Sequence, residues 1–309
     1  MMTVAVVVLS VDEAGRLETC LPALAGEDVL VVDNACADAT RVVAERHGAR
    51  VLALASRLSY AAAINRGLAA ASADAVLLLN ADCVGEPGFV APLRAALEAD
   101  AGLGSVAPRL LRAADGRVDA AGITVDRRRK NGLVGHGAEP GAYLTAAPVF
   151  GGDGAAVLWR RAALEDCAVD GEVLDEDMAL WATESDLAWR AQLRGWRCAY
   201  EPRAVARHVR TYSPSTPRSH LDAAHRRTQF RNRLLMAFKN ETGAGLARDL
   251  PWIAGYEVAA LGFALLCERE LLGAYRDAWA LRAPARRRRR AIQARRRVAR
   301  PPFGLAPPA

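Results

Sequence analysis

The sequence lacks cysteines placed to work in pairs. None of its six cysteines belongs to a C-x-x-C motif, and they are scattered along the chain as Cys20, Cys36, Cys83, Cys167, Cys198 and Cys267. This spacing argues against a disulfide framework and against a structural zinc site, because both need closely spaced thiols. We therefore expect reduced thiols and a cytoplasmic protein.

A long uninterrupted apolar run is also missing. The N-terminal stretch MMTVAVVVLSVDEAG has no basic region ahead of its apolar run of about seven residues, which is the length of a strand. We expect no signal peptide there. The apolar stretch that begins at Pro251 covers about sixteen residues and contains Glu257, so it is short for a transmembrane helix.

Acidic residues are absent from residues 281–309. This segment holds ten of the 41 lysines and arginines, so the remaining 31 basic residues face 35 acidic ones and the net charge of +6 is a property of the tail. An arginine run after an apolar helix suits a segment lying in an anionic membrane interface. A C-terminal helix packed on the domain has the same composition, so both interpretations stay open.

What the sequence does contain is an alternation of strand-like and helix-like stretches over its first hundred residues. With 52% hydrophobic and 25% charged residues, the composition is that of a folded protein. The stretches are VAVVVLS, GRLETCLPALA, DVLVVDNA, DATRVVAERHG, ARVLALA, AAAINRGLAAAS and AVLLLNADCV. Continuous apolar strands separated by helices predict an α/β fold, with a doubly wound, mainly parallel sheet covered by helices on both faces.

Polar residues follow three of these strands where each one ends. They are Ser10 with Asp12, then Asp33 with Asn34, then Asn80 with Asp82. In open α/β sheets, ligands bind beyond the carboxyl ends of the strands, so we expect these side chains to converge on one crevice. Taken singly, each acid has a simpler explanation as a helix cap or a polar turn.

The rest of the chain is less regular. Residues 105–150 are rich in glycine and charge and predict irregular strands and loops, whereas GAAVLWRRAAL predicts a strand followed by a helix. ESDLAWRAQLRGW has the spacing of an amphipathic helix, and RCAYEP predicts a short strand leading to His208. We expect a catalytic domain over 1–240, a helical segment over 241–280 that is either membrane-interfacial or packed on the domain, and an Arg/Pro-rich tail over 281–309.

The order of these pieces resembles the family 2 glycosyltransferases of GT-A fold, over roughly residues 3–240. VLVVDNACADAT is similar to the family's nucleotide-contacting strand end, SRLSYAAAINRGLAAA to its phosphate-side segment, and LLLNADCV to its D-x-D element. GGDGAAVLWRRAAL resembles its acceptor-side strand, and ATESDLAWRAQLRGW its E-D-x-D-L helix start. RNRLLMAFKN is similar to an Arg-Asn-Arg helix in rhamnosyltransferase-like members.

The resemblance implies a role for each matched residue. Asp82 and His208 would bind Mn²⁺ or Mg²⁺, Glu184 would be the catalytic base with Asp186 as the second catalytic carboxylate, and Gly152, Gly154 and Ala155 would lie on the acceptor side. Asp33 would accept a hydrogen bond from the nucleobase of the donor, and Arg66 would contact the donor's diphosphate. The full set of implied donor-binding residues is Ser10, Asp33, Asn34, Asn65, Arg66, Asn80 and Asp82.

The implied activity is an inverting, metal-dependent transfer of a sugar from a nucleotide diphosphate. The donor expected from the resemblance is a dTDP- or UDP-sugar, with rhamnose first, and the acceptor is a cell-envelope glycan or its lipid-linked precursor. The enzyme would be cytoplasmic or peripheral on the inner face of the membrane. The chain departs from the family pattern at Ser59, which replaces a glycine, at Ile64 and Asn80, and at Thr183-Glu184, which stands where Glu-Asp is usual.

Two other functions compete with this one. A sugar-nucleotide-forming nucleotidyltransferase also uses a strand-end Asp, but it needs a glycine-rich basic loop after the first strand, and SVDEAGRLETC offers none. A non-catalytic binding protein could use the arginine tail, yet this tail lacks the interleaved aromatics that stack on bases. We therefore expect no nucleic-acid partner.

Overall fold

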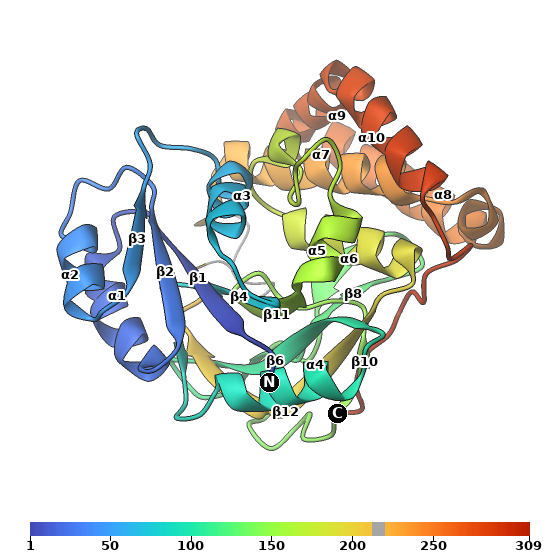
Figure 1. The fold of residues 1–309 in the computed structure, drawn as a ribbon. Helices are drawn as coiled ribbons and strands as arrows, with labels where there is room; N and C mark the ends of the chain where they lie inside the picture. The colour runs from blue at the N-terminus through green and yellow to red at the C-terminus, as the bar shows by residue number, and fades with distance from the viewer. Residues whose placement is uncertain (212–219) are drawn as a thin grey trace.

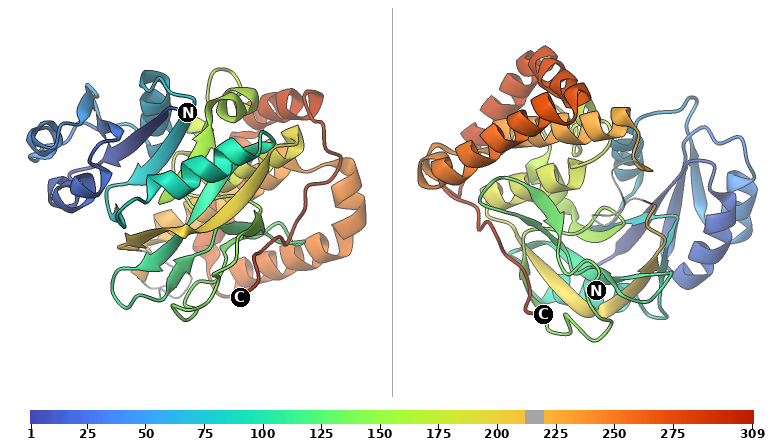
Figure 2. Two further views of the ribbon diagram at one scale, coloured as in Figure 1. Left: turned by 60° about the horizontal axis from the view of Figure 1, so that its bottom comes forward. Right: turned by 180° about the vertical axis from the view of Figure 1, so that it is seen from behind.

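A computed structural model describes residues 1–211 and 220–309. One curled ten-stranded sheet forms the centre of the molecule, and a two-stranded ribbon lies beside it (Figure 1). The C-terminal helices gather at one end, away from α1 and α2, and the segment after α10 runs back along the body to the C-terminus (Figure 2). The predicted α/β fold is confirmed.

The first half of the sheet is parallel, as the continuous apolar strands predicted. Its strands lie in the order β4-β1-β2-β3, with bounds Val4–Ser10 for β1, Asp28–Asp33 for β2, Arg50–Ala53 for β3 and Ala75–Asn80 for β4. The helices between them are α1 (Ala14–Cys20), followed by the short η1 (Leu21–Leu24), α2 (Thr40–Arg46) and α3 (Tyr60–Ala70). All seven elements predicted for this half are present.

The second half of the sheet is mixed. β11 (Ala156–Arg160) is antiparallel to both of its neighbours, β4 and β6 (Leu103–Arg112), and β12 (Arg197–His208) is parallel to β6. Short antiparallel strands complete the sheet: β5 (Cys83–Gly85), β7 (Val118–Ala120) and β10 (Ala147–Val149). The ribbon is β8 (Ile123–Val125) with β9 (Asn131–Leu133). His208 is therefore the last residue of a long strand, rather than a residue beyond a short one.

Alternate residues of the strands bury two separate apolar layers. In β1, Val4, Val6 and Val8 face the layer that includes residues of α1, α2 and α4 (Val90–Ala99), because side chains alternate along a strand. The opposite side chains face α3, α5 (Arg161–Cys167) and α6 (Thr183–Arg194). α3 lies so close to β1 that a Cβ at Gly67 would stand 2.7 Å from Val7 Cγ1. The sheet is thus covered on both faces.

Four C-terminal helices pack against this body: α7 (Ala223–Asn240), α8 (Gly243–Leu266), α9 (Leu272–Ala280) and α10 (Arg282–Ala294), with the short η4 (Arg269–Leu271) between α8 and α9. α8 is longer than the sixteen apolar residues suggested. Within the described ranges it is the one helix whose length and composition would allow it to cross a membrane. Most of its surface is exposed.

Residues 281–309, the Arg/Pro-rich segment, pack on the body through α10 and the chain that follows it. Arg288 is buried and pairs with Asp175 and Glu172, two acids before α6. Beyond α10, the Phe303 ring stacks on Phe150 at 5.8 Å and meets Trp189 edge-on at 5.1 Å. The segment was treated as a tail because its arginines have no acid nearby in sequence; the acids that pair with them lie more than a hundred residues earlier.

Phe303→Ala should lower the free energy of unfolding by about 2 kcal/mol, because it removes a partly buried ring from an aromatic cluster. Arg296→Ala, an exposed position in the same segment, is the control and should change stability by less than about 0.5 kcal/mol. Urea denaturation measures both variants. Equal stabilities for the two would contradict the packing of this segment.

Candidate active site

The strand ends converge as the sequence predicted. The register of the sheet pairs Ser10 with Asp33 and Leu9 with Asn80, so the ends of β1, β2 and β4 form one edge. Asp82 follows β4 directly, and the backbone N–H of Asn80 donates to Ala155 O at 2.9 Å. The edge is therefore continuous with the loop before β11.

Two of the predicted donor-binding residues lie at the ends of β1 and β2. Ser10 is buried, with its hydroxyl 2.9 Å from Thr40 Oγ1. Asp33 Oδ1 accepts from the backbone N–H of Cys36 at 2.8 Å, while Oδ2 lies 3.7 Å from the exposed Arg41. Asp33 thus has one carboxylate oxygen bound to the backbone and one facing a solvent-exposed cation.

The amides of Asn34 and Asn65 are engaged with the protein itself. Asn34 Oδ1 accepts from Leu58 N at 2.8 Å and Nδ2 donates to Leu58 O at 3.0 Å, which fixes the loop before α3. Asn65 makes the same pair of bonds to Leu174 and a third to Glu176. Both residues therefore shape the site's surroundings, and their direct contact with the donor stays a prediction.

Arg66 lies on the exposed side of α3. No other residue of the described chain forms an ion pair with it, so its guanidinium is available to an anion. Its contact with a diphosphate stays a prediction.

Asp82 lies between two cationic side chains. Arg16 Nη1 is 3.3 Å from Asp82 Oδ2, and His208 Nε2 is 3.3 Å from Asp82 Oδ1. The pairing of β5 with β12 sets this geometry, because Cys83 stands opposite His208 in the ladder. Asp82 Oδ1 is buried, and apart from the His208 imidazole no described group donates to it. A buried carboxylate oxygen beside an imidazole nitrogen is a candidate metal ligand.

Asp119 and Arg210, which sequence reasoning missed, hold His208 in place. The fully buried Asp119 carboxylate accepts from His208 Nδ1 at 2.8 Å and from Arg210 Nε at 2.8 Å. Burial would raise the pKa of Asp119, but the hydrogen bonds from His208 and Arg210 lower it to about 2. Burial likewise opposes the charged form of His208, yet Asp119 and Asp82 together raise the pKa of this imidazole to about 9.

Asp153 extends this network toward the acceptor-side loop. Arg210 Nη2 donates to Asp153 Oδ2 at 3.0 Å, and Asp153 Oδ1 accepts from Ala155 N at 2.8 Å. Gly152 is packed against Val157, since a Cβ there would lie 2.4 Å from Val157 Cγ2. Asp153 is the acid of the motif GGDGAA, so the sequence could have indicated its role. Asp119 lies within residues 105–150, where the sequence shows no helix or strand periodicity, so no signal pointed to it.

Glu184 sits in the first turn of α6, beside this loop. A Cβ at Gly154 would lie 2.5 Å from Glu184 Oε1, so only glycine allows the carboxylate this position. Burial raises the pKa of Glu184, and the negative charge of Asp153 adds to the effect. The Tyr60 hydroxyl lies against the same carboxylate and has a pKa well above its usual value, first because it is buried and then because of Glu184.

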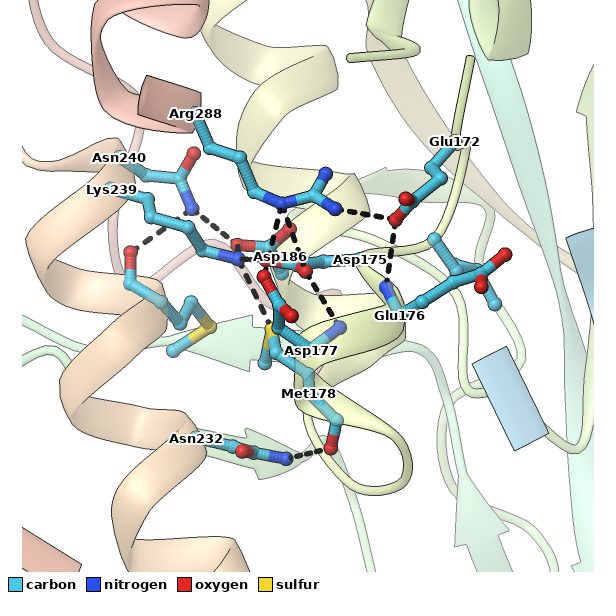
Figure 3. A network of polar contacts seen from close by, with 12 residues as sticks. Glu172, Asp175, Glu176, Asp177, Met178, Asp186, Asn232, Lys239, Asn240 and Arg288 are labelled. Carbon is cyan, nitrogen blue, oxygen red and sulfur yellow. Dashed lines mark hydrogen bonds and ion pairs between the residues drawn. The ribbon is translucent and has the colours of Figure 1, made fainter. Parts of the chain in front are cut away.

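Asp186, predicted to be catalytic, faces a different part of the molecule from Glu184. Its carboxylate accepts from Arg190 Nε at 3.0 Å. It also accepts from Asn240 Nδ2 at 2.8 Å and lies 3.0 Å from Lys239 Nζ (Figure 3). These cations lower the pKa of Asp186 against the effect of burial. Positions two apart on a helix point in different directions, so Asp186 anchors α6 to α7 while Glu184 faces the strand ends.

The donor set at Asp82 and His208 fits a divalent cation. Carboxylate oxygens suit Mg²⁺ and Mn²⁺, and an imidazole nitrogen favours the latter. Asp119 supplies the hydrogen bond to the second ring nitrogen that orients a ligating histidine. A cluster of Asp12, Cys36 and Asp38 also comes together nearby. Its carboxylates, however, accept from backbone N–H groups of Ala14, Ala37 and Thr40 and close the turn after β2.

Comparison with known proteins finds a family model that matches part of the chain. The model of glycosyl transferase family 2 matches residues 5–142, which include the ends of β1, β2 and β4. This part of the chain is similar to the glycosyl transferases of family 2. An uncharacterised glycosyltransferase of Mycobacterium tuberculosis H37Rv is 38% identical over 101 residues, which are 32% of this chain and 46% of the relative. The chain thus spans about half the length of the curated relatives that it matches.

Solved glycosyltransferases share the fold. A mannosyltransferase from Pyrobaculum calidifontis, solved with GDP-Man and Mn²⁺, has a TM-score of 0.55 and 20% identity over 95% of this chain and 79% of its own. GalNAc-T7, solved with UDP, GalNAc and Mn²⁺, has a TM-score of 0.58 and 12% identity over 77% of this chain and 48% of its own. At these identities the likeness concerns the fold.

The pKa of His208 can be tested directly. In the metal-free protein, NMR should show this imidazole titrating near pH 9. Asp119→Asn should lower the pKa of His208, because burial disfavours the protonated imidazole and the Asp119 carboxylate no longer compensates for it. Since the folded pKa lies above the ordinary 6.5, protonated His208 stabilises the fold fully below about pH 6.5, and this stabilisation is lost as the pH rises through about 9.

Asp115→Asn is the matched control for this titration. Asp115 lies near Asp119 in sequence, but it is partly exposed and bonds to Arg112. It should leave the pKa of His208 unchanged. A wild-type value near 6.5 would show that the contacts to Asp82 and Asp119 do not govern His208.

Proposed function

We propose that the protein is a metal-dependent glycosyltransferase that moves a sugar from a nucleotide diphosphate to an acceptor hydroxyl. The observation that carries this proposal is the buried pair formed by Asp82 Oδ1 and His208 Nε2, which lie 3.3 Å apart at the ends of neighbouring strands. The match of residues 5–142 to the model of glycosyl transferase family 2 supports it. So do the nucleotide sugar and Mn²⁺ bound to the mannosyltransferase of the same fold.

Asp82 and His208 would hold the divalent cation. When bound, such a cation neutralises the negative charge that develops on a departing diphosphate. Arg16 is next to Asp82 and Arg66 is exposed on α3, so both can stabilise diphosphate oxygens without leaving their helices. Asp33, at the end of β2, is proposed to accept a hydrogen bond from the nucleotide base.

Glu184 is proposed as the general base. Its pKa is raised by burial and by Asp153, which brings a carboxylate closer to the operating pH and makes it a better proton acceptor. Gly154 and Ala155 line the loop beside it, which is where the acceptor hydroxyl is proposed to bind. A single base and direct displacement imply inversion at the anomeric carbon.

The identity of the sugar is the finer part of the proposal. We favour a dTDP- or UDP-sugar, with rhamnose first, because the α7 segment Arg231-Asn232-Arg233 resembles rhamnosyltransferase-like members of the family. A cell-envelope glycan or its lipid-linked precursor is the proposed acceptor. A panel of nucleotide sugars, screened for thermal stabilisation with Mn²⁺, identifies the donor.

Substitution of Glu184 by Gln should keep donor binding and lower kcat by roughly 10²-fold, the range for loss of a general base. Asp82→Asn should instead abolish the turnover that depends on Mn²⁺. Release of nucleoside diphosphate measures turnover, and calorimetry measures donor affinity. If Glu184→Gln weakened donor binding and left turnover of bound donor unchanged, Glu184 would be a binding residue.

We propose further that α8 docks on an anionic lipid surface. Between residues 250 and 267 the one charged residue is Glu257, and its carboxylate is bound inward by Arg233. Cations border this apolar face near its N-terminal end: Arg248 is exposed, and the Arg127 guanidinium lies over the Trp252 ring at 5.2 Å. An apolar helix face with arginines and a tryptophan at its border fits lipid with anionic headgroups.

This proposal keeps the helical segment over 241–280 as the membrane contact and leaves out the arginine run that follows it. Arg287 pairs with Asp170 and Arg288 with Glu172, so these two guanidinium groups of α10 serve the fold. Their charge is already matched by acids of the body. The membrane contact would therefore rest on the apolar area of α8 and on the few cations beside it.

Val258→Glu with Leu266→Glu should abolish sedimentation with anionic vesicles, because both side chains are more than 70% exposed and a carboxylate there opposes burial in lipid. Val42→Glu, at an apolar position of α2 that is 59% exposed, is the control and should leave sedimentation unchanged. Wild-type protein that ignores vesicles, or that forms a dimer broken by the α8 variant, would contradict lipid docking.

A further inference from the structure

The loop between η2 (Glu176–Met178) and α6 holds three residues with positive φ angles. Ala179, Trp181 and Ala182 have φ values of 61°, 67° and 58°, and none of them is glycine. A Cβ in this region crowds the neighbouring carbonyl oxygen, so non-glycine residues avoid it. Three such residues within four positions persist only where the surroundings hold them.

Asn232 on α7 provides most of that hold. This fully buried residue has its amide nitrogen 2.8 Å from Met178 O, 2.5 Å from Leu180 O and 2.9 Å from Trp181 O (Figure 3 shows the first). The two N–H groups of one side-chain amide therefore serve three carbonyls of the strained loop, with at least one N–H shared between two of them. The backbone of the loop turns around this single nitrogen.

Arg231 fixes the orientation of that amide. Its Nε donates to Asn232 Oδ1 at 2.9 Å, so the oxygen faces the guanidinium and the nitrogen faces the loop. Arg231 Nη2 also donates to Met178 O at 3.2 Å. On the other side of the loop, Ala179 O accepts from Ala61 N at 2.9 Å, in the first turn of α3. The loop is thus held between α7 and α3.

The position of Glu184 depends on this loop. α6 begins at Thr183, and its first turn is closed by the bond from Asp186 N to Ala182 O at 2.9 Å. Ala182 is the last left-handed residue, so its backbone sets the direction in which the helix starts. Tyr60, whose hydroxyl lies against Glu184, is the residue before Ala61. Both side chains therefore take their place from segments that the loop joins.

We propose that Asn232 is a positioning residue for Glu184. By holding three carbonyls of residues 178–181, it keeps the loop in its strained conformation and presents the Glu184 carboxylate beside Gly154 and Tyr60. The inference rests on the proposed function for the role of Glu184, but the hold on the loop does not. It also accounts for an asparagine buried in α7, a helix that contributes no group to the strand-end site.

The test replaces Asn232 by Asp, which has nearly the same size but turns the donating nitrogen into an oxygen that repels three carbonyls. We expect kcat for sugar transfer to fall by between about 10-fold and 10²-fold, with the donor KM within about twofold of wild type. Hydrogen exchange of the peptide covering residues 177–186 should become faster. If the variant does not fold, Asn232→Ala takes its place with the same expectations.

Rescue by glycine separates positioning from general stability. Ala179→Gly with Ala182→Gly lets the loop keep positive φ without strain. Added to Asn232→Asp, this pair should restore at least about a third of the lost kcat. Arg227→Ala is the control. Arg227 lies on α7, as Asn232 does, but it pairs with Asp277 of α9, so its loss should change neither hydrogen exchange of the loop nor kcat.

The exchange measurement keeps this inference apart from the proposed function. Unchanged exchange of residues 177–186 in Asn232→Asp would overturn the hold on the loop, whatever the activity. Faster exchange with unchanged kcat, or a loss of kcat that the glycine pair does not relieve, would overturn the positioning of Glu184. A wild-type protein that transfers no sugar, but whose loop loosens in the variant, would instead count against the proposed function.

Discussion

The buried carboxylate of Asp119 is the group on which the candidate site depends. It accepts hydrogen bonds from His208 and Arg210, and through them it connects two other acids, Asp82 and Asp153. A buried charge is stable only when it is paired and hydrogen-bonded, so the loss of any one of these groups leaves another buried charge without its partner. The network ties β7 to the end of β12, and it links the proposed metal ligands to the loop beside Glu184.

The sequence predicted the first half of the site well because parallel strands bring their ends together by rule. Asp33, Asn80 and Asp82 could be placed on one edge from the apolar runs before them. The position of Asp119 could not be predicted, because its strand, β7, has three residues and because His208, the hydrogen-bond partner of Asp119, lies 89 positions later. Nor could the direction of β11, since four apolar residues followed by Arg160 can form an antiparallel strand as well as a parallel one.

Sequence periodicity also failed to separate Glu184 from Asp186. Both carboxylates fall in the first turn of α6, and the resemblance suggested catalytic roles for both. Their environments decide the matter: Gly154 and Tyr60 surround one, whereas Lys239, Arg190 and Asn240 bind the other. The arginine segment was misjudged for a similar reason, since the acids that pair with Arg288 become its neighbours only in the folded chain.

Asp82 and His208 are proposed to bind a divalent cation together with a nucleoside diphosphate. The decisive measurement is the anomalous diffraction, at the manganese absorption edge, of a crystal grown with Mn²⁺ and UDP. We expect one anomalous peak between Asp82 and His208, in contact with diphosphate oxygens. A peak at Asp12, Cys36 and Asp38 instead, or nucleotide bound without metal beside His208, would contradict it.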